Sequence, residues 1–139
     1  MKIMIDTNIL ISAALFPNGT AAKAFQKSLT QPFEPVICEY IIDEMRRKFH
    51  EKFADRTAAL ETFLETATPV IRIVAVPSKP LAHEKRIRDA KDRPILRAAL
   101  TANVDFLLTG DKDFLEATIE KPKIVSAADF LSISNFADE

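Results

Sequence analysis

Two aspartates in this 139-residue chain stand where short apolar runs end. Asp6 directly follows residues 2–5, and Asp111 follows residues 106–109 after a single glycine, Gly110. If the two runs are adjacent parallel strands, both carboxylates lie at the same edge of a sheet, where the carboxyl ends of parallel strands form binding sites. Carboxylate oxygens gathered at such an edge are suitable ligands for a hard divalent cation.

A third aspartate, Asp92, stands at the start of a predicted helix. On a helical wheel it shares a face with apolar residues three, four and seven positions later, Ile95, Leu96 and Ala99. This face is expected to point into the protein. A carboxylate directed inward is unfavourable unless a cationic group meets it, so Asp92 is a candidate ligand.

A fourth acidic candidate lies in the predicted helix 39–53, and it is either Asp43 or Glu44. Both flank the apolar stripe of that helix about equally, so the spacing does not choose between them. Each acid also has an ordinary explanation on its own. Asp6, Asp92 and Asp111 could cap helices, and Glu44 could pair with Lys48 one turn later on the surface.

The chemical hypothesis rests on several carboxylates meeting at one edge. Like charges repel, so such a group persists only if a cation shares it. Oxygen ligands without His or Cys favour Mg²⁺ or Mn²⁺. A cation of this kind acidifies a bound water and neutralises phosphoryl oxygens, which suits phosphodiester hydrolysis. Asn8 and Thr109 could orient a carboxylate or a water, or could simply satisfy nearby backbone groups.

The elements that must position these residues alternate between strand and helix. Short apolar strands with helical crossovers predict an α/β fold, with a mainly parallel central sheet covered on both faces. The length fits a single domain over residues 1–139. The patterns predict strands over residues 2–5, 33–38, 70–76, 105–109 and 123–125, and helices over residues 8–15, 20–29, 39–53, 55–67, 94–103 and 126–131, with a short helix after Asp111.

The composition excludes several other classes of protein. The chain has only two glycines, Gly19 and Gly110, so it has no dinucleotide-binding loop and no Walker A loop. A nucleophile elbow is also absent. Cys38 is the only cysteine, and two distant histidines, His50 and His83, lack zinc-ligand spacing. The net charge of −1 provides no overall positive field to attract nucleic acid.

Four motifs in order resemble those of the PIN domain family. These are Ile5-Asp6-Thr7-Asn8, Asp43-Glu44-Met45, Asp89-x-x-Asp92-x-Pro94 and Thr109-Gly110-Asp111-Lys112-Asp113. The subgroup that the chain looks most like is the VapC-type toxins of bacterial toxin–antitoxin systems. The resemblance covers essentially the whole chain and implies a three-layer α/β/α sandwich. It also implies a Mg²⁺- or Mn²⁺-dependent endoribonuclease.

The resemblance also implies roles for particular residues. The acidic set is Asp6, Glu44, Asp92 and Asp111, which selects Glu44 over Asp43, and Asp113 is an auxiliary ligand. Arg93 departs from the family pattern, because many relatives have a further acid there, and this raises the question of a second metal ion. The implied partners are an RNA substrate, a cognate antitoxin and a second copy of the chain in a homodimer.

Basic residues cluster between positions 79 and 93, next to Asp92. They could form a phosphate-positioning rim or a solvated loop face, and the sequence does not decide between these alternatives. The cluster consists of Lys79, Lys85, Arg86, Arg88, Lys91 and Arg93. A second basic run, residues 46–48, is expected on the solvent side of its helix.

Two rival functions are weighed against the nuclease. An aspartate-based phosphohydrolase needs a second acid two residues after its nucleophile, and Asn8 stands there instead. A non-catalytic binding module could keep the fold, but the intact acidic set argues against it. The longest apolar stretch, residues 9–16, is too short for a membrane span, and no signal peptide is evident. The expected location is therefore the cytoplasm.

Overall fold

The first strand of the chain occupies the centre of a parallel sheet. The computed structural model describes residues 1–133, so the last six residues of the predicted domain lie outside the described part. The sheet has five strands in the order β3-β2-β1-β4-β5, and each of its four pairings is parallel. The strands are β1 (Lys2–Ile5), β2 (Glu34–Cys38), β3 (Arg72–Val74), β4 (Phe106–Leu108) and β5 (Lys123–Val125).

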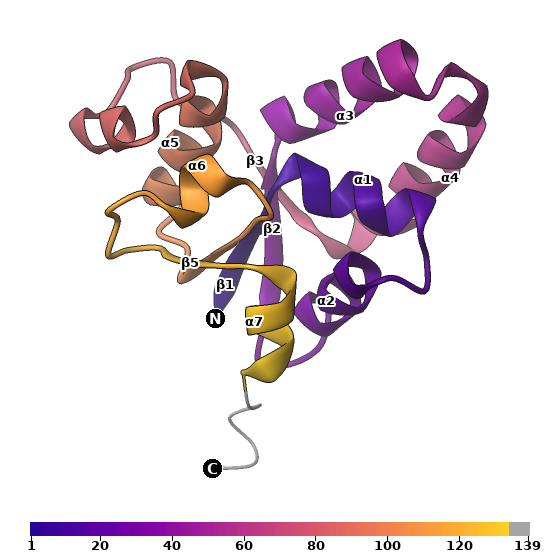
Figure 1. Ribbon diagram of the computed structural model, residues 1–139, viewed down its shortest axis with the longest axis horizontal. Coiled ribbons are helices and arrows are strands. Elements are labelled where there is room, and N and C mark those ends of the chain that lie inside the picture. The colour runs from indigo at the N-terminus through magenta and orange to yellow at the C-terminus, as the bar shows by residue number, and fades with distance from the viewer. Residues whose placement is uncertain (134–139) are drawn as a thin grey trace.

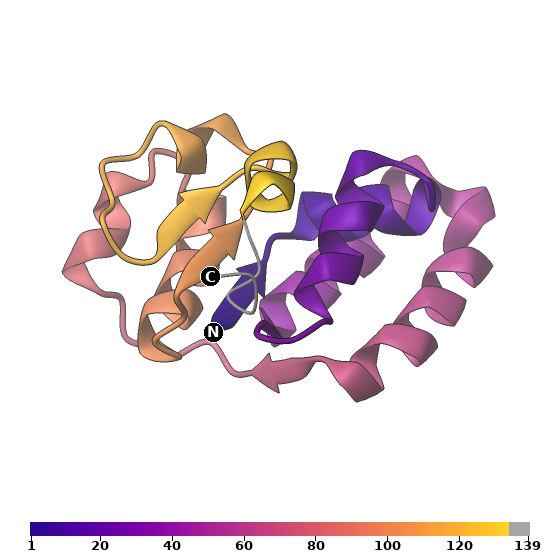
Figure 2. The same ribbon diagram turned by 90° about the horizontal axis from the view of Figure 1, so that it is seen from below.

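Helices cover both faces of this sheet, which confirms the predicted α/β/α sandwich. Right-handed crossovers from β1 towards β3 place four helices on one face, and the return to β4 places α5 on the other. Figure 2 shows α5 on the side of the sheet opposite α1, α2 and α7. The helices are α1 (Thr7–Leu15), α2 (Thr20–Ser28), α3 (Glu39–Lys52), α4 (Thr57–Ala67), α5 (Arg93–Thr101), α6 (Lys112–Leu115) and α7 (Ala127–Ser132).

Local sequence signals explain where several helices begin. Asp6 caps α1 by accepting a hydrogen bond from the Thr7 N–H, and Ser126 caps α7 in the same way through the Asp129 N–H. Pro94 lies in the first turn of α5, where its missing N–H costs no helical hydrogen bond. The apolar stripe of α3 is buried, with Ile41, Met45 and Phe49 all at 0% exposure.

The prediction of a strand over residues 70–76 is wrong at both ends. A short 3-10 turn, η2 (Thr68–Val70), precedes β3, and β3 itself has only three residues. The last pair in its ladder joins Cys38 to Val74, and the chain turns into α3 immediately after Cys38. Residues 75 and 76 therefore extend past the end of β2. The β-branched run is consistent with a strand, but the length of its partner limits the pairing.

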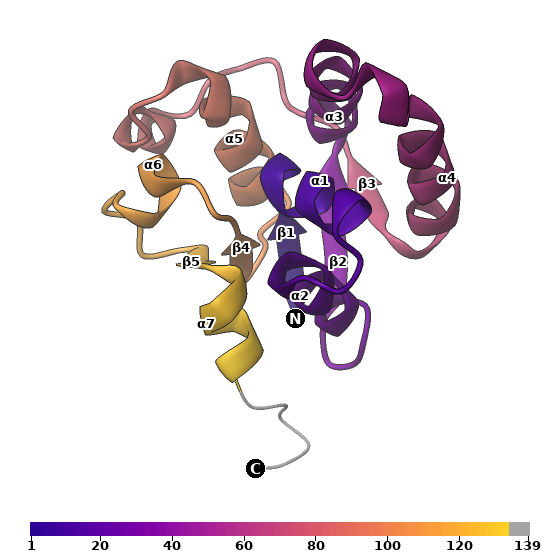
Figure 3. The ribbon, with the colours of Figure 1, turned by 45° about the vertical axis from the view of Figure 1, so that its right-hand side comes forward.

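The core joins the sheet to α2 and α7 through aromatic contacts. Phe33 packs edge-on against Phe130, with ring centroids 4.9 Å apart, and Phe106 lies 6.4 Å from the same ring. The Nζ of Lys27 donates to the carbonyl oxygen of Phe130 at 2.8 Å and contacts the face of its ring. These contacts hold α7 against α2, as Figure 3 shows.

The strands all point towards the same edge of the sheet, where α1, α3, α5 and α6 begin (Figure 1). The segment before α5 includes two short 3-10 turns, η3 (Ala82–Arg86) and η4 (Ala90–Asp92). Within residues 1–133, no helix is both long and apolar enough to cross a membrane.

Candidate metal centre

Acidic side chains from four parts of the chain meet at this edge and line one cavity of about 280 Å³, here called the acidic pocket. All four predicted acids are among its lining residues, together with four basic side chains. The pocket is lined by Asp6, Asn8, Glu44, Arg47, Lys48, Glu51, Lys52, Asp89, Lys91, Asp92 and Asp111. The predicted convergence of the acids is therefore present in the fold.

Asp6 is the most constrained of the four acids. Its Oδ1 accepts a hydrogen bond from the Thr7 N–H at 2.8 Å, and its Oδ2 accepts one from the Thr109 hydroxyl at 2.7 Å. Burial raises the pKa of Asp6 to about 6, although these two hydrogen bonds oppose the shift. The neighbouring Glu44 and Asp111 carboxylates raise it further.

Asp92 has the most strained electrostatic environment. The residue is 9% exposed, and its Oδ2 is buried without a hydrogen-bond partner among the described residues. Burial raises the pKa of Asp92 to about 8, with further contributions from Asp111, Asp6 and Asp89. A buried carboxylate oxygen without a partner, close to other carboxylates, fits a site that a cation completes.

Asp111 and Glu44 complete the acidic set. The Oδ1 of Asp111 accepts a hydrogen bond from the Asp113 N–H at 2.9 Å, which caps α6. Glu44 is 6% exposed, accepts a hydrogen bond from the Thr7 hydroxyl, and lies 3.5 Å from the Arg47 guanidinium. Asp43 is exposed, so of the two candidates in α3 only Glu44 enters the pocket.

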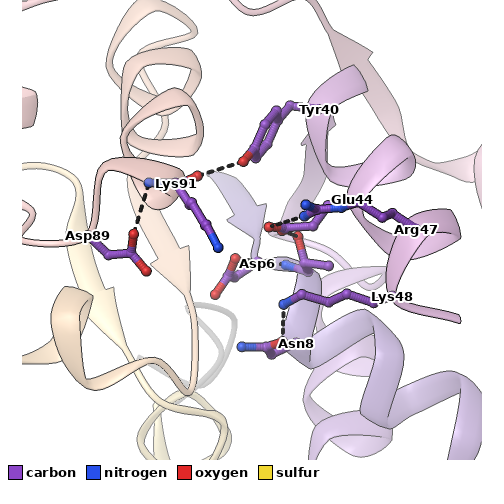
Figure 4. A network of polar contacts seen from close by, with 9 residues as sticks. Asp6, Asn8, Tyr40, Glu44, Arg47, Lys48, Asp89 and Lys91 are labelled. Atoms are coloured by element: carbon purple, nitrogen blue, oxygen red, sulfur yellow. Dashed lines mark hydrogen bonds and ion pairs between the residues drawn. The ribbon is translucent and has the colours of Figure 1, made fainter. Parts of the chain in front are cut away.

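The three supporting residues have different positions. Thr109 is fully buried, and its hydroxyl contacts both Asp6 and the backbone N–H of Asp111. Asn8 lines the pocket, but its amide oxygen accepts from the Lys48 Nζ at 3.1 Å instead of contacting an acid (Figure 4). Asp113 is not among the residues lining the pocket and forms a 2.6 Å ion pair with Arg88.

A second group of acidic residues shares Asp92 with the acids that line the pocket. Carboxylate oxygens of Asp89, Asp92 and Asp113 all lie within 4.8 Å of one another. The Arg88 guanidinium already partners Asp113, and the Asp89 carboxylate accepts the Lys91 N–H. Asp92, which carries the unpartnered oxygen, therefore belongs both to this group and to the acids that line the pocket.

The second basic run, residues 46–48, is divided between the surface and the pocket. Arg46 lies on the exposed side of α3, paired with Glu61, as expected. Arg47 and Lys48 also line the pocket. The Arg47 side chain is nevertheless 51% exposed, as expected, whereas Lys48 is only half-exposed. Their positions three and four residues after Glu44 carry the signal, since such residues share one helix face.

The stretch between residues 79 and 93 contributes one of its six basic residues to the pocket lining, Lys91. Arg88 pairs with Asp113, and the Arg93 Nε donates to the Ile87 carbonyl oxygen at 3.0 Å. Arg86 donates to the Thr118 carbonyl oxygen at 3.1 Å. The basic cluster as a whole therefore does not line the acidic pocket.

A protein-family model described as the PIN domain matches residues 2–113. The chain belongs to the PIN domain family. An uncharacterized protein of Methanocaldococcus jannaschii is 27% identical over 121 residues, which span 83% of this chain and 74% of that relative. The family assignment confirms the resemblance drawn from the four motifs.

Solved structures share this PIN fold at low sequence identity. VapBC2 from Rickettsia felis, bound to a DNA fragment from its promoter, has a TM-score of 0.67 and 16% identity, covering 91% of this chain and 98% of that one. FitAcB from Neisseria gonorrhoeae has a TM-score of 0.65 and 22% identity, covering 91% and 98%. VapC20 from Mycobacterium tuberculosis, a sarcin–ricin loop cleaving toxin, has a TM-score of 0.61 and 15% identity, covering 86% and 97%.

Proposed function

We propose that this PIN protein is a metal-dependent endoribonuclease that hydrolyses phosphodiester bonds of RNA with Mg²⁺ or Mn²⁺ in its acidic pocket. The observation that carries the proposal is the buried, unpartnered Oδ2 of Asp92 beside the Asp6 and Asp111 carboxylates. A helix cap explains Asp6 and Asp111 individually, but it does not explain why Asp92 stays buried among like charges.

Each acid has a distinct role in this proposal. Asp6, Asp92 and Asp111 hold the cation, whose chemistry is to acidify a bound water and neutralise charge on the phosphate. Glu44 stands at the side of the pocket, where Thr7 and Arg47 hold it. It orients the attacking water or accepts a proton from it. Thr109 positions Asp6, and Asp113 stays an auxiliary residue that orients the Asp111 carboxylate through its N–H.

The reaction requires no covalent intermediate with the protein. A water oxygen forms a bond to phosphorus while the bond from phosphorus to the leaving ribose oxygen breaks. The proton released by the water ends on the leaving oxygen or in solvent, so the step needs no other reactant. An aspartate-based phosphohydrolase would need an acid at position 8, where the Asn8 amide is engaged by Lys48.

The substrate class and partners are proposed by likeness to the solved structures. VapC20 cleaves the sarcin–ricin loop, which supports RNA as the substrate here. VapBC2 and the VapBC of Salmonella typhimurium were solved as DNA-bound complexes, which supports a VapC-type toxin with a cognate antitoxin. We further propose that residues 1–139 form one PIN nuclease domain, that two copies form a homodimer, and that the protein acts in the cytoplasm.

The decisive experiment compares the parent chain with Asp6→Asn on a labelled single-stranded RNA, with and without Mn²⁺. We expect the parent to cleave only with the metal, and the variant to lose cleavage by at least ~100-fold, because a metal ligand is removed. Circular dichroism should show the same fold in both. Equal cleavage by the two proteins would contradict the proposal.

Calorimetric titration with Mn²⁺ separates the nuclease from a non-catalytic module. The nuclease should take up the ion in the millimolar range or below, and Asp6→Asn should weaken this uptake. A parent chain that takes up no metal would support a PIN-fold binding module instead. Cleavage of DNA but not RNA would leave the metal site intact and would overturn the substrate class alone.

A further inference from the structure

Lys91 stands in the acidic pocket as a cation that no acid among residues 1–133 engages. It lines the pocket together with Asp6, Glu44, Asp92 and Asp111. Within residues 1–133, its Nζ has no carboxylate oxygen within 4.0 Å and forms no hydrogen bond. Figure 4 shows its side chain directed from the wall next to Asp89 towards Asp6.

The backbone of Lys91 is held on both sides. Its N–H donates to the Asp89 Oδ1 at 3.0 Å, and its carbonyl oxygen accepts from the Tyr40 hydroxyl at 2.7 Å. Tyr40 belongs to α3, so this bond joins the two walls of the pocket. The side chain of Lys91 therefore starts from a defined point, directly before Asp92 in the chain.

The other cations of the pocket are engaged or distant. Arg47 contacts Glu44, and Lys48 donates to Asn8. Lys52 lies roughly two helical turns beyond Glu44 along α3. Among the four basic side chains, Lys91 is the one that directly precedes a candidate metal ligand in the chain and whose ammonium has no acid within 4.0 Å in residues 1–133.

We propose that the Lys91 ammonium is a catalytic residue that donates a hydrogen bond to a non-bridging oxygen of the scissile phosphate. This inference rests on the proposed nuclease function and deepens it. A phosphodiester entering the pocket meets a surplus of carboxylates, and the Lys91 ammonium offsets that repulsion. The same contact strengthens as negative charge develops on the phosphoryl oxygens in the transition state. Tyr40 is a positioning residue that acts through Lys91.

The first test measures single-turnover cleavage of a labelled oligoribonucleotide at saturating Mn²⁺. Lys91→Met should lower the rate constant by about 100- to 1,000-fold, the range found when one preorganised donor to a developing oxyanion is removed. Lys91→Arg should retain most of the activity, because it keeps the charge and the donors. The matched control is Lys23→Met, which makes the same charge change at an exposed position on α2 and should cleave like the parent.

The second test measures Mn²⁺ uptake without RNA, by calorimetry. Lys91→Met should bind Mn²⁺ as tightly as the parent or more tightly, since it removes a positive charge near the site. Lost cleavage with intact metal uptake is the expected combination. If Lys91 were only a counter-ion for the empty pocket, Lys91→Met would take up metal more tightly and cleave as fast as the parent, which would overturn the proposal.

A binding arm keeps this inference separate from the proposed hydrolysis. The affinity of the oligoribonucleotide is measured by anisotropy in Ca²⁺, and Lys91→Met, but not Lys23→Met, should weaken it. If the parent binds RNA without cleaving it, the proposed hydrolysis fails. The phosphate contact of Lys91 is then tested by the RNA affinities alone. Unchanged affinity and unchanged rate would both contradict a phosphate contact.

The role of Tyr40 is tested by a double-mutant cycle on the cleavage rate. Tyr40→Phe removes the hydroxyl that holds the Lys91 carbonyl oxygen and should slow cleavage less than Lys91→Met does. In the Lys91→Met background, Tyr40→Phe should have no further effect, because it acts through the missing ammonium. Additive losses would show that Tyr40 acts independently.

Discussion

A single hydroxyl connects two of the candidate metal ligands. The Oγ1 of Thr109 donates to the Asp6 Oδ2 at 2.7 Å and accepts from the Asp111 N–H at 3.0 Å. Since Asp6 follows β1 and Asp111 follows β4, this one side chain links the ends of two neighbouring strands. Groups that orient metal ligands in this way tune metal affinity without contacting the metal themselves.

Replacing Thr109 by valine should therefore weaken metal binding while keeping the shape of the side chain. We expect Thr109→Val to lower Mn²⁺ affinity by about 10- to 100-fold, as is typical when a partner of a metal ligand is removed. Calorimetric titration measures the change, and Thr109→Ser, which keeps the hydroxyl, should stay close to the parent. Parent-like affinity in Thr109→Val would show that the hydroxyl does not position Asp6.

At the scale of elements, one ion pair anchors the segment that carries Asp89, Lys91 and Asp92. Glu84 in η3 pairs with Arg97 in α5, with Nη2 2.8 Å from Oε1. The Oε2 of Glu84 also accepts from the Leu81 N–H and the Arg97 Nε. Arg97 reaches onward to the Pro77 carbonyl oxygen at 2.9 Å. The pair thereby holds the loop before η3 against α5.

Breaking this pair should destabilise the protein more than breaking a surface pair does. The Glu84 and Arg97 side chains are 5% and 14% exposed, whereas those of Glu61 and Arg46 are 52% and 53% exposed. We expect Glu84→Gln to lower the melting temperature by several degrees, because Arg97 keeps a buried charge without its partner. Glu61→Gln is the matched control and should change it little. Equal shifts in the two variants would contradict the anchoring role.

The same pair has a defined pH dependence. Its hydrogen bond from Arg97 lowers the pKa of Glu84 below the ordinary value of 4.5. Its stabilisation is therefore complete above that ordinary value and is lost as the pH falls through the lowered pKa of the folded state. The difference in melting temperature between the parent and Glu84→Gln should accordingly shrink in strong acid.

At the scale of the whole molecule, the acidic pocket is a source of instability, which a cation would relieve under the proposed function. Burial raises the pKa of Asp6 to about 6 and that of Asp92 to about 8, from the ordinary 3.8. At pH values between the ordinary pKa of 3.8 and these raised pKa values, the folded protein keeps protons that the unfolded chain has released. The contribution of these two groups to the free energy of unfolding therefore falls as the pH rises through this range.

The metal-free protein should lose stability between about pH 5 and about pH 8, and Mn²⁺ should restore it most strongly at the higher pH. Asp92→Asn should raise the metal-free melting temperature near pH 8, because it removes a buried charge, and should diminish the stabilisation by Mn²⁺. Thermal unfolding at both pH values, with and without Mn²⁺, measures this. Asp43→Asn, at an exposed position in α3, should behave like the parent.

The features that could be predicted from the sequence are those that depend on residues close to one another in the chain. The helix caps at Asp6 and Ser126, the proline in the first turn of α5 and the buried stripe of α3 are all signals within one or two turns of chain. The alternation of apolar strands with helices predicts the parallel sandwich, and four motifs in order predict the family. The acids at strand ends follow from the same pattern, because parallel strands end at one edge.

The tertiary structure alone decided how these residues pair. Asp113 pairs with Arg88, and Lys48 donates to Asn8, each across at least 25 positions of the sequence. Within residues 1–133, Lys91 has no acid within 4.0 Å of its ammonium. The length of β3 likewise depended on where β2 ends. Capping and periodicity are local energies that short segments express by themselves, whereas ion pairs and strand ladders form only when the strand order has placed distant segments together.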